Sequence, residues 1–225
     1  MHRLALFENV SSDTMNTLTR IGKVEEYPKG NILIRAKEPQ KYIYIQIKGK
    51  SIVYNLTHTG KRKILFIFGP GMILNDHVFN EHHSAVYCET MEKSKILKIA
   101  SSEFVSCMEK DFVLTRAVVI MQEKKMWRLA HQLKNTTGSI AMERKLAAKL
   151  WKLSRDFGVS TPDGIEIDMN LSVTFLADML GTPRETASRL CGTLVNHGLI
   201  RMKNKRIIII NPRKMALFYK TGVMT

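Results

Sequence analysis

The sequence has few cysteines, and they are not arranged to bind a metal. Its 225 residues contain only three, which are scattered along the chain and form no C-x-x-C pair. An odd number of separated cysteines argues against a disulfide framework and against a structural zinc site. We therefore expect a reduced, cytoplasmic setting. The three residues are Cys88, Cys107 and Cys191.

Long apolar runs are also missing. The first ten residues, MHRLALFENV, contain too short an apolar stretch for a secretory signal. The longest runs, such as 64–68 and 207–210, have the length of a strand, whereas a helix that crosses a bilayer needs about 20 apolar residues. The sequence thus predicts no membrane segment and no membrane partner.

Short enzyme motifs are absent as well. The chain has no G-x-S-x-G, no P-loop, no H-E-x-x-H and no convincing Cys–His pair, so we do not expect an enzyme.

Acidic residues are scarce beside basic ones: 20 Asp and Glu stand against 35 Lys and Arg, which gives a net charge of +15. Such an excess points to a polyanion, whether DNA, RNA or an anionic membrane.

The first hundred residues predict a small antiparallel β structure. Short runs rich in β-branched and aromatic residues alternate with glycine-containing turns, a pattern typical of a barrel or jelly roll. The expected strands are 41–49, 51–56, 63–68, 84–89 and 94–99.

A long helix is expected next, because no Gly or Pro occurs between Ser102 and Lys134 and the apolar residues take helical spacing. About 25 helical residues would extend about 38 Å, which is long for one small barrel. The remaining apolar face predicts a coiled-coil homodimer, with a single buried helix as the alternative. The two apolar groups are Leu114, Ala117, Val118 and Met121, then Met126, Leu129, Ala130 and Leu133.

Three parts of the chain follow from this pattern. We expect an effector-sensing roll at 1–109, a long dimerisation helix with a hinge at 110–137, and a DNA-binding domain at 138–225. The hinge is assigned to 135–139, NTTGS. An amphipathic helix is expected at 142–154, and a turn at 161–164 before the strand-like 165–169.

The segment 171–200 has the pattern of helix, tight turn, helix. Gly181 suits the turn, because a positive φ costs least without a Cβ. Thr182 is expected to cap the second helix, Pro183 to take its first position, and Glu185 to complete a T-x-x-E capping box. Residues 201–210 then predict a β-hairpin, or wing, with lysines at its tip.

The start of the second helix carries the residue types that read DNA. In a helix-turn-helix the N-terminal side chains of this helix meet base edges in the major groove, where Arg reads guanine and Glu accepts from cytosine. The alternative is a helix cap beside a solvated basic face. The expected DNA-binding residues are Thr182, Arg184, Glu185, Thr186, Ser188, Arg189, Lys203 and Lys205.

The pattern L-A-x-x-x-G-x-x-R-E-T-x-x-R-L at 176–190 resembles the Crp/Fnr family of bacterial transcription regulators. The resemblance spans nearly the whole chain and is weaker in the barrel. It implies an α+β fold: an N-terminal antiparallel β-roll of the cyclic-nucleotide-binding type, a long dimerisation helix and a C-terminal winged helix-turn-helix. It also implies a homodimer on a palindrome of TGTGA-like half-sites, with Arg184 and Arg189 on guanines and Glu185 on the cytosine side. RNA polymerase would be a further partner.

The same resemblance places an effector pocket in the roll and argues against cyclic AMP. Cyclic-AMP-binding members have a cassette that begins G-E and ends R-S-A, whereas here Asn75-Asp76 and His83-Ser84-Ala85 stand in those places. A neutral His does not match a guanidinium fork on a phosphate, and no Ser or Thr occurs between Arg116 and Asn135. The resemblance does not identify the effector; a small apolar or aromatic molecule is one alternative. The expected pocket residues are Ile73, Asn75, Asp76, His83, Ser84, Met126 and Trp127.

Histidines in the same loop leave other interpretations open. A His near this place ligates haem in the carbon-monoxide-sensing members, which makes His77 a candidate, and His77, His82 and His83 could hold a divalent metal. Ordinary surface histidines are the simpler interpretation. The redox-sensing members bind an iron–sulfur cluster through cysteines grouped near the N-terminus. Such a cluster is not expected here, because the first cysteine is Cys88. A basic protein that binds nucleic acid without sequence preference is the other alternative.

Overall fold

The structure is a computed structural model that describes residues 4–79, 83–137 and 141–223. Its contacts divide the chain into two compact units, Met1–His131 and Gln132–Thr225, and each is described by itself. No helix in the described ranges is long and apolar enough to cross a membrane.

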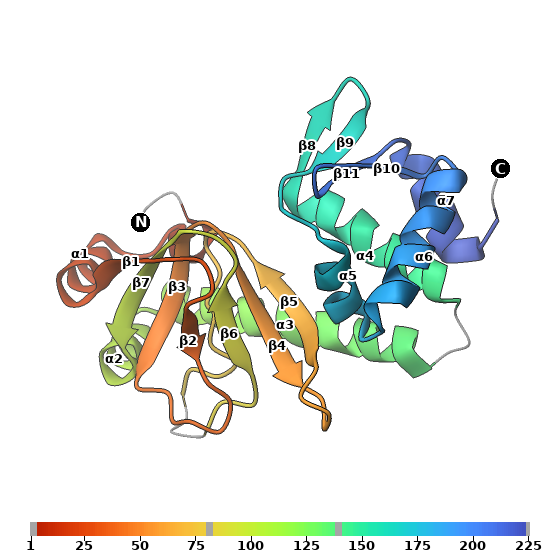
Figure 1. The fold of residues 1–225 in the computed structure, drawn as a ribbon. Helices are drawn as coiled ribbons and strands as arrows, with labels where there is room; N and C mark the ends of the chain where they lie inside the picture. Colours follow the sequence, from red (N-terminus) through yellow and green to blue (C-terminus); the bar gives the residue numbers. More distant parts are fainter. Residues whose placement is uncertain (1–3, 80–82, 138–140, 224–225) are drawn as a thin grey trace. The chain divides into compact units, whose positions relative to one another are not determined.

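The N-terminal unit is a β-roll of two antiparallel sheets (Figure 1), as the sequence predicts. The strand orders are β1-β7-β3 and β2-β6-β4-β5. All five expected strands are present. Two further strands, β1 and β2, are too short or too charged to stand out in the sequence. The bounds are β1 (Lys23–Tyr27), β2 (Ile32–Ile34), β3 (Tyr42–Lys48), β4 (Ser51–Leu56), β5 (Arg62–Phe68), β6 (Tyr87–Thr90) and β7 (Ser94–Ala100).

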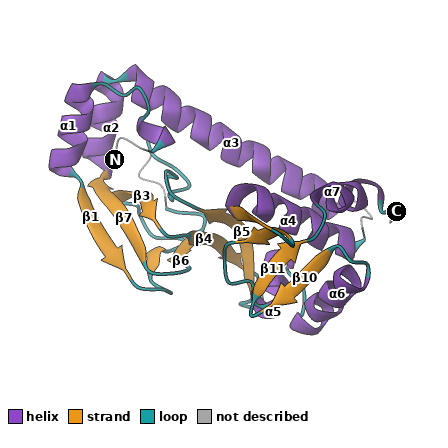
Figure 2. Ribbon diagram, turned by 90° about the horizontal axis from the view of Figure 1, so that it is seen from above, coloured by secondary structure: helices purple, strands orange, loops and turns teal. Residues whose placement is uncertain are grey.

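Helices cover the first of these sheets. A short 3₁₀ helix, η1 (Ala5–Phe7), precedes α1 (Ser12–Ile21), and α2 (Ser101–Lys110) follows β7 directly. Figure 2 shows α1 and α2 side by side next to β1 and β7. Their apolar faces share one core with β3, β7 and the first turns of α3 (Phe112–Thr137). Leu114 and Val118 of α3 are buried in that core, so the expected inner face of the long helix is confirmed.

The long helical stretch is interrupted at Asp111, which the sequence did not predict. Asp111 has extended backbone angles, and its carboxylate accepts hydrogen bonds from the backbone N–H groups of Val113 and Leu114. It also accepts one from Ser11 N at 3.0 Å. Burial alone would raise the pKa of this carboxyl, but these hydrogen bonds outweigh it and lower the pKa to about 2. An N-cap therefore starts α3 here and fixes its direction against α1.

The C-terminal unit is a winged helix-turn-helix, also as predicted. Its sheet has the order β10-β11-β9-β8. The expected turn at 161–164 lies between two strands of a hairpin, and α7 has no counterpart among the expected elements. The bounds are α4 (Met142–Phe157), β8 (Gly158–Thr161), β9 (Gly164–Ile167), α5 (Val173–Leu180), α6 (Arg184–Asn196), β10 (Ile200–Lys203), β11 (Arg206–Ile209) and α7 (Pro212–Thr221).

The predicted hinge at 135–139 lies partly outside the described residues, which omit 138–140. Its first three residues continue α3 as regular helix.

Candidate nucleic-acid interface and effector region

The turn between α5 and α6 has the geometry that its glycine predicts. Gly181 has φ 71° and ψ 42°, and its N–H donates to Ala177 O at 2.7 Å. Because this conformation is left-handed, a residue with a Cβ would be strained there. The turn fixes the angle at which α6 leaves α5.

The predicted cap of α6 is wrong. The N-cap is Pro183, with φ −58° and ψ 150°, and no side chain caps the helix. Thr182 instead belongs to the end of α5, because its N–H donates to Ala177 O at 3.1 Å. The T-x-x-E capping box consequently does not form, and the carboxylate of Glu185 is not engaged by the helix start.

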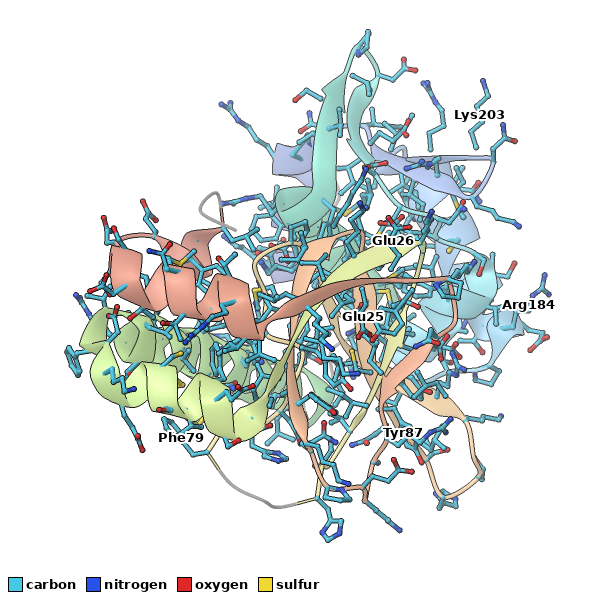
Figure 3. All side chains as sticks on the ribbon, turned by 90° about the vertical axis from the view of Figure 1, so that its left-hand side faces the viewer. Glu25, Glu26, Phe79, Tyr87, Arg184 and Lys203 are labelled. Carbon is cyan, nitrogen blue, oxygen red and sulfur yellow. The ribbon has the colours of Figure 1, made fainter. Side chains whose placement is uncertain are left out.

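One face of α6 is packed and the other is open. Ala187, Leu190, Cys191 and Leu194 are buried. Arg184, Glu185, Ser188 and Arg189 are exposed, and Thr182 and Thr186 are partly exposed. In the described part of the chain the side chains of Arg184, Glu185 and Arg189 make no ion pair with the protein, and Arg184 extends away from the ribbon (Figure 3). The open face therefore presents two guanidinium groups and one carboxylate to solvent.

The wing tip is a two-residue turn that carries two exposed lysines. Lys203 pairs with Arg206 across the hairpin, and the central residues Asn204 and Lys205 have φ 50° and 63°. Positive φ at both positions is typical of a type I′ turn, which matches the twist of the strands. The carbonyl of Lys205 accepts from Leu171 N at 2.8 Å. This bond attaches the tip to the segment that precedes α5.

Arginines near the wing are ion-paired, whereas its tip lysines are not. Arg206 contacts Asp168 at 2.7 Å, and Arg201 contacts Asp163 at 2.7 Å. Lys203 and Lys205 form no ion pair with any described residue. Their ammonium groups thus remain available for an external anion such as a phosphate.

A row of apolar side chains on α3 lies exposed in the single chain. Phe112, Val119, Met126 and Leu133 are spaced by seven residues and are 77%, 43%, 66% and 64% exposed. A heptad spacing of apolar residues is the pattern by which two helices pair. Trp127, the other aromatic of this segment, is 61% exposed, and the centroid of its ring lies 3.7 Å from the centroid of the His131 ring.

The predicted effector residues of the roll are brought together, but most of their polar atoms already bond to the protein. Asn75 accepts from Tyr44 N at 2.8 Å and donates to Tyr42 O at 2.9 Å. Asp76 accepts from Ser84 Oγ at 2.9 Å and from Ala85 N at 2.8 Å. Ile73 is fully buried in the core.

Three predicted pocket residues do not face this cluster. His83 is exposed and pairs with Pro39 in an isolated β-bridge. Met126 and Trp127 are exposed on α3. A groove of about 490 Å³ between α1 and α2 is open to solvent and contains none of the predicted pocket residues.

Lys125 of α3 does reach the cluster, although no sequence pattern singled it out. It is 7% exposed, and its ammonium donates to Ile73 O at 2.8 Å and to Asn75 O at 2.9 Å. The Phe68 ring centroid lies 5.1 Å from Nζ. Burial lowers the pKa of Lys125 to about 8. Its place in the polar run QEKK gave no sign of burial.

The histidine candidates are separated. Nδ1 of His77 lies 3.2 Å from the Asp76 carboxylate, and its Nε2 is buried without a hydrogen-bond partner in the described structure. His82 lies outside the described residues, and His83 is exposed. Within the described ranges no three His, Cys, Asp or Glu side chains gather as a metal site. A single imidazole nitrogen does not by itself define a haem pocket.

Comparison with known proteins agrees with both units. Residues 24–111 match the family model of the cyclic nucleotide-binding domain, and residues 144–218 match that of the Crp-like helix-turn-helix domain. The global nitrogen regulator of Synechococcus elongatus is 24% identical over 84% of this chain and 86% of its own length. The CRP-like cAMP-activated global transcriptional regulator of Mycobacterium tuberculosis is 23% identical over 95% of this chain and 96% of its own length.

Solved structures share the fold at low identity. The c-di-GMP responsive global regulator CLP of Xanthomonas campestris superposes with a TM-score of 0.77 at 18% identity, over 89% of this chain and 100% of that one. A CooA mutant from Carboxydothermus hydrogenoformans gives 0.75 at 22% identity, over 91% and 90%. With its cyclic nucleotide-binding domain and its DNA-binding Crp-like helix-turn-helix, the chain belongs to the Crp/Fnr family of transcription regulators.

Proposed function

We propose that this transcription regulator acts as a homodimer that reads a palindrome of TGTGA-like half-sites. The observation that carries the proposal is the open face of α6, where Arg184, Glu185 and Arg189 project without partners among the described residues. Arg is suited to the O6 and N7 of guanine and Glu to the amino group of cytosine. The absence of a T-x-x-E capping box supports this role, because Glu185 is not already used.

The exposed apolar row on α3 supports the homodimer. Burying Phe112, Val119, Met126 and Leu133 against a second copy would remove four large side chains from water. Two recognition helices would then meet successive major grooves, one helical turn or about 34 Å apart.

The wing lysines add affinity without sequence information. Lys203 and Lys205 are exposed at the tip, which supports the proposal that they contact phosphates beside the groove. Because each phosphate contact releases counterions, their contribution should weaken with salt on every DNA sequence alike.

The roll is proposed to control DNA binding through α3, and cyclic AMP is not the proposed effector. The name of the Mycobacterium tuberculosis relative includes activation by cAMP, but this chain has Asp76 in place of a glutamate and an exposed His83 in place of an arginine. An imidazole that faces solvent does not provide the guanidinium fork that a cyclic phosphate would need. RNA polymerase is the proposed partner at promoters.

The test begins with selection from a pool of random duplexes, using the purified protein, so that the operator is found without assuming its sequence. Arg184→Ala should then weaken binding to the selected site by about 1–3 kcal/mol and relax the base preference at one position of each half-site. Fluorescence anisotropy at several salt concentrations measures both effects.

Arg213→Ala is the matched control, because Arg213 is an exposed arginine of the same unit on α7. It should leave the selected sequence and its affinity unchanged. Equal losses for Arg184→Ala on selected and random DNA would contradict base reading and favour a non-specific basic binder. Enrichment of sites without two-fold symmetry would contradict the homodimer on a palindrome.

A further inference from the structure

The cluster of Asn75, Asp76 and Ser84 offers a ligand little that the protein has not already bonded. Both ends of the Asn75 amide bond to β3, and both oxygens of Asp76 accept hydrogen bonds. Two backbone carbonyls of the same loop, Ile73 O and Asn75 O, remain as acceptors, and the ammonium of Lys125 takes both. A side chain of α3 thus engages two carbonyls that this loop would otherwise offer to a ligand.

Lys125 is the polar link between α3 and this loop. Met121, one turn earlier on α3, makes a second contact, in which Ile73 N lies 3.3 Å from its thioether sulfur. This hydrogen bond is weaker because a thioether is a poor acceptor. Charge-assisted hydrogen bonds are stronger than neutral ones and fix the donor more tightly. The ammonium therefore sets the position of α3 along the roll at the level of residue 125.

Packing alone does not explain why a cationic side chain is buried here. Removing an ammonium from water costs several kcal/mol, and the described surroundings provide no carboxylate in hydrogen-bonding contact with it. Methionine is also unbranched, is only one atom shorter, and would fill similar space without that cost. The charge is best explained by the two carbonyls that it holds.

We propose that Lys125 is an internal occupant of the effector position, joining α3 to residues 73–75 in the place of a small molecule, so that the regulator binds its DNA site without a ligand. The inference rests on the proposed function and deepens it, because it names how the roll holds the dimerisation helix. An effector of this protein would have to displace the ammonium instead of filling an open pocket.

The experiment compares wild type, Lys125→Met and Lys124→Met. Lys124 is the exposed neighbour on the same helix, so its variant removes the same charge without touching the roll. Native mass spectrometry of the purified protein first establishes whether any small molecule is bound. Hydrogen exchange of residues 72–76 and 118–126, without DNA, then reports how firmly Lys125 holds α3 to the loop. Fluorescence anisotropy with the duplex selected from the random pool measures DNA binding.

We expect wild type to have the mass of bare polypeptide and to bind the selected duplex. Lys125→Met should exchange at least fivefold faster in both segments and bind the selected duplex at least tenfold more weakly, with random DNA unaffected. Lys124→Met should match wild type in every measurement.

Three results would overturn the proposal: a bound small molecule in active wild type, a requirement for added ligand, or binding by Lys125→Met equal to that of Lys124→Met. If Lys125→Met does not fold, the first two measurements on wild type still decide. A random pool from which no sequence is enriched would instead contradict the proposed function. Comparing hydrogen exchange between the variants would still test separately whether Lys125 joins α3 to residues 73–75.

Discussion

The buried charge of Lys125 should make the stability of the N-terminal unit depend on pH in an unusual direction. Burial lowers its pKa to about 8, from an ordinary value of 10.5. Between these values the unfolded chain holds a proton that the folded chain has released. Stability therefore rises with pH across this window, and the full penalty of the buried ammonium is present below pH 8.

The magnitude follows from 1.36 kcal/mol for each pH unit crossed. From pH 8 to pH 9.5 the free energy of unfolding should rise by roughly 1 to 2 kcal/mol more in wild type than in Lys125→Met, because at pH 8 the folded lysine is still half protonated. The groups that face the ammonium are Asp76 from the loop, which favours its charged form, and Cys88 from β6. Burial raises the pKa of the Cys88 thiol to about 12, so it stays protonated throughout this range.

Urea unfolding followed by tryptophan fluorescence measures the difference. The chain has two tryptophans, and Trp151 lies in the C-terminal unit, so a Trp151→Phe background makes Trp127 report on α3. Tyrosine ionisation near pH 10 affects wild type and Lys125→Met alike, so the difference between their profiles isolates Lys125. Lys124→Met should follow wild type at every pH. Parallel pH profiles for wild type and Lys125→Met would refute the assignment of a strongly depressed pKa to this lysine.

Three further substitutions test other parts of the structure. Asp111→Ala should lower the free energy of unfolding of the N-terminal unit by about 1–2 kcal/mol, because it removes the N-cap of α3; an unchanged urea midpoint would exclude that role. Lys205→Gly should raise the melting temperature, because φ 63° suits glycine, and should lower the salt dependence of DNA binding by about one ion. A gain in stability without that change of salt slope would show that Lys205 contacts no phosphate. Met126→Glu should dissociate the dimer in sedimentation, whereas Lys124→Glu should not, and a persistent Met126→Glu dimer would rule out the α3 heptad as the interface.

Local sequence patterns predicted the helix-turn-helix and the wing of the DNA-binding unit, but not its last helix, α7. The turn at Gly181, the buried face of α6 and the wing with Lys203 and Lys205 at its tip all follow from short-range rules on φ angles and apolar spacing. The strands of the roll were found for the same reason where alternation was clear. The very short β2 and the charged β1 carry too little of that signal.

Hydrogen bonds that the sequence pattern does not reveal decided the rest. Thr182 and Pro183 fit a cap by sequence, but hydrogen bonding to α5 assigns Thr182 to the preceding turn. Asp111 interrupts the long helix because Ser11, one hundred positions earlier, also donates to its carboxylate.

Lys125 shows the same limit most clearly. Within QEKK it is indistinguishable from its exposed neighbour Lys124. The sequence determined that this segment is helical. Only the tertiary structure determined which lysine turns inward, because the roll supplies the two carbonyls that hold its ammonium in a buried place.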